Sequence, residues 1–218
     1  MITPSNEDTF NLFPIFATPM AIIRIGKDVF DKEKLLEKCE FNDTQIDANG
    51  SYSTLAGGSE TFNILNLFPE EKEILMSYFN DFKNRALKLT TTDFAMTTSW
   101  VTKTIPGASS QPHIHKNSVF SAVFYFDDIP ANGGKIAFES VGIQSDTMLL
   151  NNPDEWTPYT SKSWIYPPEK NALLIFPSSV FHRVTTNDSD QDRYSLAMNF
   201  FPTGKIGNCD SYIDFKTI

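Results

Sequence analysis

Short apolar runs in the second half of the chain constrain the fold more than any other feature. After Asp93, runs rich in β-branched and aromatic residues alternate with turn signals such as Gly133-Gly134. The runs cover residues 95–105, 119–127, 135–139, 172–176 and 193–201. Many short strands separated by turns are typical of an antiparallel sandwich or barrel. The sequence therefore predicts a mainly β core within residues 93–218.

The first part of the chain has a different pattern, which favours helices flanking that core. Residues 69–89 begin with Pro69 near the first helical position, carry two glutamates in the first turn, and repeat apolar residues at helical spacing. A shorter helix is expected at 31–39, a strand region at 13–25 and a loop at 48–60. We expect residues 1–92 to supply a strand and helices that pack on one side of the core, within one overall domain.

Composition bounds the class of protein. The chain has 218 residues, 40% of them hydrophobic, and a formal net charge of −9. This acidic balance argues against broad binding to nucleic acid or to an anionic membrane, because both need basic patches. Cys39 and Cys209 are too few for a disulfide framework, and neither a signal peptide nor a membrane-spanning run is visible. We expect a cytoplasmic protein; its oligomeric state is not readable, and a homodimer is one option.

All three histidines of the chain fall where a metal site would need them. His113 and His115 form an H-x-H pair, and His182 follows a second apolar run and a Pro-Ser-Ser turn. An H-x-H pair on an extended strand points both imidazoles to one face, because strand side chains alternate. Neutral imidazole is a common ligand for iron, zinc, copper and nickel. The alternative is a surface pair with an unrelated core histidine.

Arg193 stands eleven residues after His182 and opens the last apolar run. Strand alternation places Arg193, Ser195, Ala197 and Asn199 on one face and the larger apolar residues on the other. A guanidinium that points into a barrel needs an anionic partner, and its fork matches a carboxylate. The alternative is a surface salt bridge.

Five motifs in this order resemble the 2-oxoglutarate- and Fe(II)-dependent oxygenases, and more closely those encoded by phages and marine bacteria. The similar segments are residues 113–118, 121–126, 133–139, 176–184 and 192–200, together with the start at 12–19. Each motif is modest alone, whereas five in the right order are specific.

The resemblance implies a double-stranded β-helix, or jelly roll, with Fe(II) at its open end and 2-oxoglutarate as cosubstrate. His113 and His182 would be iron ligands, while Arg193 and Ser195, with Tyr125 nearby, would hold the cosubstrate. His115 stands where the superfamily has a carboxylate, so three histidines would form the metal site; a second register pairs His115 with Asn117. On this basis an aspartate at position 115 is predicted to raise turnover. The implied activity is a dioxygenase that hydroxylates an unidentified substrate, which could be a prolyl residue of a protein, a free amino acid or another small metabolite. It would act in the host cytoplasm if a phage encodes it.

Two other classes stay open. A cupin-like three-histidine metal enzyme fits the spacing from Gly107 to the histidine pair, but it gives Arg193 no role. A non-catalytic binding protein on the same scaffold would explain the missing carboxylate. Metal content and 2-oxoglutarate binding distinguish the three classes. The aromatic segment 144–168 is expected either near the pocket mouth or as a packed surface excursion.

Overall fold

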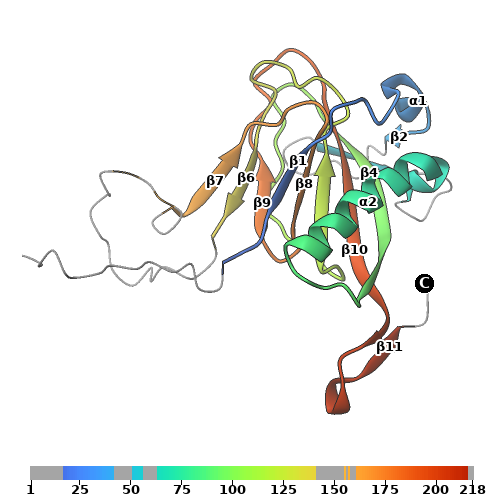
Figure 1. Ribbon diagram of the computed structural model, residues 1–218. Helices are drawn as coiled ribbons and strands as arrows, with labels where there is room; N and C mark the ends of the chain where they lie inside the picture. Colours follow the sequence, from blue (N-terminus) through green and yellow to red (C-terminus); the bar gives the residue numbers. More distant parts are fainter. Residues whose placement is uncertain are drawn as a thin grey trace, which may run out of the picture.

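The computed structural model describes residues 17–41, 63–140, 155, 157 and 161–215, together with the backbone of residues 51–55. Two antiparallel sheets face each other within these residues (Figure 1). The cluster between them joins Val123, Leu174 and Phe176 of the larger sheet to Ile136 and Phe138 of the smaller one. This mainly β architecture with flanking helices is that of a double-stranded β-helix, as predicted.

The larger sheet contains eight strands. Its order is β1 (Ala21–Arg24), β8 (Ala172–Pro177), β5 (Phe120–Phe124), β10 (Arg193–Ile206), β4 (Asp93–Thr104), β3 (Ser51–Leu55) and β2 (Glu40–Phe41), with β11 (Ile213–Phe215) paired to β10. The smaller sheet has the order β7 (Ser163–Tyr166), β6 (Ile136–Glu139) and β9 (Phe181–Val184). Each of the five predicted runs overlaps one of these strands, with ends shifted by a few residues.

Helix α2 (Pro69–Arg85) covers the outer face of the larger sheet (Figure 1). Glutamates in its first turn and basic residues in its last turn match the helix dipole. Leu75, Phe79 and Phe82 are buried, and the ring of Phe79 stacks on Phe200 of β10 at 4.0 Å between centroids. The predicted helix is confirmed, although it ends at Arg85. None of the described helices is long and apolar enough to cross a membrane.

The shorter predicted helix is α1 (Lys32–Glu37), which Asp31 caps by accepting a hydrogen bond from the Lys34 amide at 3.2 Å. Two short 3-10 helices, η2 (Ile64–Leu67) and η3 (Cys209–Ser211), complete the elements in the described part of the chain. One core cluster contains Leu35 of α1, Leu75 of α2 and Val101 of β4. The division of the chain at residue 93 stays a prediction.

Two predicted loops contain strands. Residues 51–55 form β3 inside the segment 48–60, because Ser51, Tyr52 and Ser53 pair with the end of β4. Residues 163–166 form β7 inside the segment 144–168. In both places the neighbouring residues are polar or turn-forming, so the local sequence predicts a loop. The short strand forms because it pairs with a strand distant in sequence. Trp156 and Tyr159, also named in the second segment, lie outside the described residues.

A β-bulge decides which side chains of β4 reach the interior between the sheets. The register between β10 and β4 shifts between Asn199 and Phe200, so one extra residue of β4 is accommodated there. Met96 before the bulge and Val101 after it both pack in the core beneath the helix. In a regular strand an even-numbered and an odd-numbered residue would point to opposite faces, so the bulge reverses the alternation. The residues left on the opposite face after the bulge are Thr98, Trp100 and Thr102.

Candidate metal centre and cosubstrate pocket

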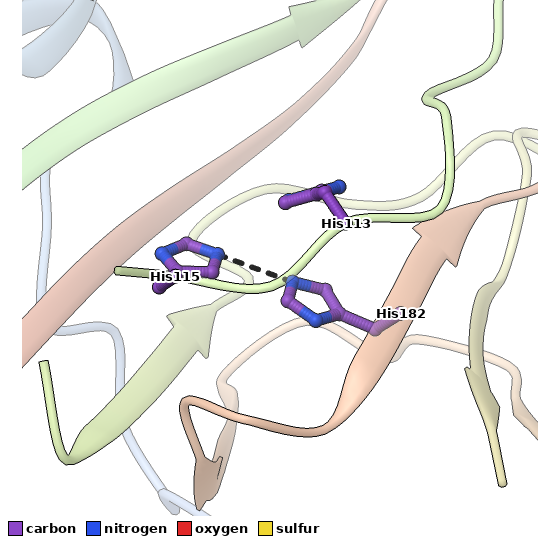
Figure 2. A group of neighbouring side chains, drawn as sticks. All are labelled: His113, His115 and His182. Carbon is purple, nitrogen blue, oxygen red and sulfur yellow. Dashed lines mark hydrogen bonds between the residues drawn. The ribbon is translucent and has the colours of Figure 1, made fainter. Parts of the chain in front are cut away.

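The three histidines converge on one point between the sheets. One ring nitrogen from each of His113, His115 and His182 lies within 4.8 Å of the others. Nε2 of His115 is 3.2 Å from Nε2 of His182, and Figure 2 shows the three rings around a common space. The prediction that these residues meet is therefore confirmed.

Backbone pairing places the histidines. His113 and His182 exchange two amide-to-carbonyl hydrogen bonds of 3.0 Å, which form an isolated antiparallel bridge between the segment after β4 and strand β9. The amide of His115 donates to the carbonyl of Ser178 at 3.0 Å. The H-x-H pair lies in none of the described strands, and only His113 forms a β-bridge; this corrects the expectation that the pair would sit on a strand.

The ring of each of two histidines is held by a backbone carbonyl two residues earlier. Nδ1 of His113 is 2.8 Å from the Gln111 oxygen, and Nδ1 of His182 is 2.9 Å from the Val180 oxygen. A carbonyl can only accept, so Nδ1 carries the proton and Nε2 presents its lone pair to the centre.

Burial keeps two of the rings neutral. It lowers the pKa of His182 to about 3 and that of His115 to about 4, and the nearby charge of His113 adds to both shifts. A histidine must be neutral to bind a metal. Three imidazole nitrogen donors on one side of a cavity suit iron, zinc, copper or nickel, and they leave coordination positions open on the other side. No acidic side chain joins this cluster within the part of the chain that is described.

Arg193 is the largest fully buried side chain described, with 1% of its surface exposed. Its Nε and Nη1 have no hydrogen-bond partner among the described residues, and its guanidinium lies over the Tyr125 ring at 5.3 Å. Burial lowers the pKa of the guanidinium, but arginine stays charged. An uncompensated buried charge is costly, so this position is built for an anion.

Ser195 and Tyr125 lie beside this arginine on the same cavity wall. Ser195 is 5% exposed, and the Tyr125 hydroxyl is fully buried without reaching hydrogen-bond geometry to any described group. Burial also raises the pKa of Tyr125, which keeps the phenol protonated and able to donate. The residues present therefore fit a bound carboxylate: one fork of buried donors and a hydroxyl next to it.

A cavity of about 800 Å³ connects the histidines to Arg193. This volume is within the range of small-molecule sites. Trp100 forms part of its wall and stacks on the His115 ring at 5.5 Å and 27°. The cavity residues of β4, which are Thr98, Trp100 and Thr102, were not identified from the sequence. Their alternating positions indicate that they share one face of the strand. Which face that is depends on the bulge, which the sequence does not reveal.

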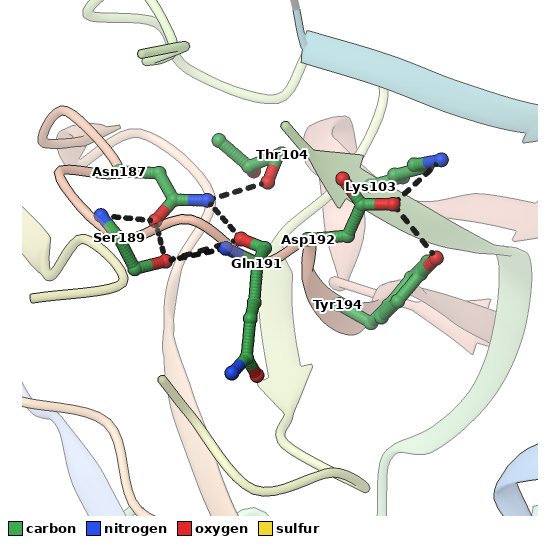
Figure 3. A network of polar contacts seen from close by, with 7 residues as sticks. All are labelled: Lys103, Thr104, Asn187, Ser189, Gln191, Asp192 and Tyr194. Carbon is green, nitrogen blue, oxygen red and sulfur yellow. Dashed lines mark hydrogen bonds and ion pairs between the residues drawn. The ribbon is translucent and has the colours of Figure 1, made fainter. Parts of the chain in front are cut away.

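The turn before β10 is held by a separate polar network (Figure 3). Buried Asn187 donates to the carbonyls of Thr104 at 2.9 Å and Gln191 at 2.8 Å, while its own oxygen accepts from Ser189. Asp192 pairs with Lys103 at 2.8 Å. The carboxylate next in sequence to Arg193 is thus engaged on the other side of the strand, which leaves the arginine available for a ligand.

The fold and the site together suit an enzyme class in which a metal held by histidines acts beside a carboxylate cosubstrate. Residues 98–199 match a family model described as "Putative 2OG-Fe(II) oxygenase", and this range contains the three histidines, Tyr125, Arg193 and Ser195. Over this range the chain is similar to the 2-oxoglutarate- and Fe(II)-dependent oxygenases, a family that uses iron and 2-oxoglutarate to oxidise a substrate with dioxygen. A search of curated proteins finds no match to the chain.

Solved structures with the same fold come from this class. The carbocyclase SnoK of nogalamycin biosynthesis is similar with a TM-score of 0.56 and 15% identity, covering 84% of this chain and 79% of that one. A Pseudomonas putida prolyl-4-hydroxylase is similar with a TM-score of 0.51 and 16% identity, covering 84% of this chain and 92% of that one. HygX from Streptomyces hygroscopicus, with nickel and 2-oxoglutarate bound, is similar with a TM-score of 0.52 and 11% identity, covering 85% of this chain and 84% of that one. At these identities the likeness shows the fold.

Proposed function

We propose that the protein is a dioxygenase that hydroxylates a small molecule, with His113, His115 and His182 as the iron ligands. Arg193 and Ser195 bind the far carboxylate of 2-oxoglutarate, and Tyr125 donates a hydrogen bond to it. The single observation that carries this assignment is the buried, unpaired guanidinium of Arg193 in the same cavity as three convergent histidines.

Bound iron would supply the oxidation: dioxygen and 2-oxoglutarate give succinate and carbon dioxide, and one oxygen atom enters a C–H bond of the substrate. The chain's own residues bind and orient. Arg193 neutralises one carboxylate of the cosubstrate and fixes its distance from the histidines, while Phe138 and Phe176 pack around His182 and limit water on that side.

The remaining cavity wall supports a small polar substrate. Thr98, Thr102, Ser110 and Gln111 line it together with Trp100, so the wall offers hydroxyl and amide groups and an aromatic ring. The similar structures include a prolyl-4-hydroxylase and a carbocyclase of nogalamycin biosynthesis, so the same fold leaves the reacting compound open.

A cytoplasmic location and the absence of nucleic-acid or membrane partners belong to the same proposal. Support comes from the net charge of −9 and from Cys39 and Cys209, which form no disulfide. A homodimer and a phage source are further proposals, the second on the resemblance of the motifs.

The test is anaerobic loading of the purified protein with Fe(II), followed by exposure to air and 2-oxoglutarate. Succinate release above that of a His182→Ala control is expected, and candidate small molecules that stimulate it identify the substrate. Binding of metal and 2-oxoglutarate without succinate under any of these conditions would instead identify a binding protein. Metal binding without any affinity for 2-oxoglutarate would favour the cupin-like class.

A further inference from the structure

His115 differs from the other two histidines in how its ring is held. The rings of His113 and His182 are fixed by backbone carbonyls, which no substitution can remove. Nε2 of His115 faces Nε2 of His182, so its Nδ1 edge points away from the centre. Asn199 lines the same cavity as His115; burial lowers the pKa of the His115 ring, and hydrogen bonding with the Asn199 side chain opposes that shift. The third histidine therefore relies on a side chain where the others use the main chain.

Asn199 is itself held in one orientation. Its Nδ2 donates to the Thr98 hydroxyl at 2.9 Å, and its Oδ1 accepts from the Ser121 hydroxyl at 2.8 Å. An amide oxygen has two lone pairs, so Oδ1 can also accept the Nδ1 proton of His115. The two contacts from neighbouring strands fix which end of the amide faces the ring.

The same network reaches the backbone of His115. The Ser121 hydroxyl is 2.8 Å from that of Ser178, which lies 2.8 Å from that of Ser118. The carbonyl of Ser178 accepts from the His115 amide at 3.0 Å. One connected set of polar groups thus holds both the main chain and the ring of this histidine. A residue left over from an ancestral carboxylate would not need such support.

We propose that Asn199 is a positioning residue that makes His115 a third metal ligand. Oδ1 accepts the Nδ1–H of His115, which fixes the tautomer with the Nε2 lone pair directed at the metal, while Trp100 stacks on one face of the ring. This inference rests on the proposed function. It explains why position 115 has a histidine where the family has a carboxylate: the surrounding residues are arranged to hold an imidazole.

The loss of such an outer partner lowers metal affinity by about 10- to 100-fold. Asn199→Leu removes the acceptor at similar volume, and Asn199→Asp is the matched control that keeps one. We expect Ni(II) affinity, measured by calorimetry on the metal-free protein, to fall by that factor in Asn199→Leu. In Asn199→Asp the affinity should stay within about threefold of wild type, since the acceptor remains. The visible spectrum of the Co(II) form should change in the leucine variant alone.

Equal Ni(II) affinity and identical Co(II) spectra in wild type and Asn199→Leu would overturn the positioning role. A measurement on the unmodified protein guards against a variant that does not fold. In the Zn(II)-loaded wild type, ¹⁵N chemical shifts of the His115 ring should show a protonated Nδ1 and a metal-bound Nε2, and the opposite tautomer would reject the proposal. Failure of wild type to bind any of these metals would instead reject the proposed function.

Discussion

The two faces of strand β10 carry different kinds of side chain. Leu196, Met198 and Phe200 point to the helix-covered side and belong to the main apolar cluster. Arg193 and Asn199, with the residues between them on the same face, point to the cavity between the sheets. The first face is apolar and fully packed, whereas the second contains a buried charge without a partner.

This difference separates stability from function within one strand. The packed face contributes burial energy to the folded protein whether or not a ligand is bound. The cavity face holds groups that cost free energy until a ligand satisfies them. Substitutions on the first face should therefore change unfolding, and those on the second should change ligand binding with little loss of stability.

The largest effect is expected from Phe200→Ala on the packed face. Phe200 is 1% exposed and stacks on Phe79 at 4.0 Å and 3°, so truncation leaves a cavity in the core. We expect a loss of about 3–5 kcal/mol in the free energy of unfolding, measured by urea denaturation. At low temperature, the folded variant should bind Ni(II) like wild type. A loss below about 1 kcal/mol would contradict the comparison.

On the cavity face, Arg193→Ala should weaken 2-oxoglutarate binding by roughly 2–4 kcal/mol, because a desolvated carboxylate loses its charged partner. Titration calorimetry on the Ni(II)-loaded protein measures the effect, and unchanged affinity would reject the role of Arg193. Arg193→Met is the matched control for stability. It should unfold at no lower urea concentration than wild type in the absence of ligand, since it removes an unpaired buried charge.

His115→Asp tests whether the cavity face is adapted to imidazole. The sequence alone predicted a gain, because an aspartate restores the superfamily's carboxylate. The structure predicts a loss of turnover, because the shorter aspartate side chain can neither stack on Trp100 nor interact with Asn199 as the imidazole does. We expect succinate release after anaerobic iron loading to fall by about tenfold or more, on the scale of disturbing a ligand's outer partners. Faster release by the variant would restore the original expectation.

The smallest effect concerns pH. The pKa values of His182 and His115 are lowered to about 3 and about 4 in the folded protein, while an unfolded histidine titrates near 6.5. Below pH 6.5 the unfolded chain therefore binds more protons, and stability falls as the pH drops toward the folded values. Between pH 6.5 and 5.5 the loss in the metal-free protein should be about 1 kcal/mol for each histidine.

Urea denaturation across this pH range checks that slope. His115→Asn should reduce it, whereas Phe200→Ala should lower the whole curve without altering its dependence on pH. A slope that is the same in wild type and His115→Asn would show that the ring of His115 is not buried as described.

Local patterns in the sequence were enough for much of the fold. The amphipathic spacing from Pro69 predicted α2, and alternation along Arg193, Ser195 and Asn199 predicted which residues share a face. The convergence of the three histidines followed from their position at the ends of apolar runs. The roles of Arg193, Ser195 and Tyr125 stay proposals, as does that of the histidines as ligands.

The sequence by itself determined the periodicities, the charge and the set of chemically active residues, because these depend on neighbours within one turn or strand. Tertiary structure decided the rest. The bulge opposite Asn199 selects which β4 side chains line the cavity, and β3 exists through its pairing with β4. Asn199 meets Thr98 across 101 positions of the chain and Ser121 across 78. Contacts at such separation depend on sheet register, which no local pattern encodes.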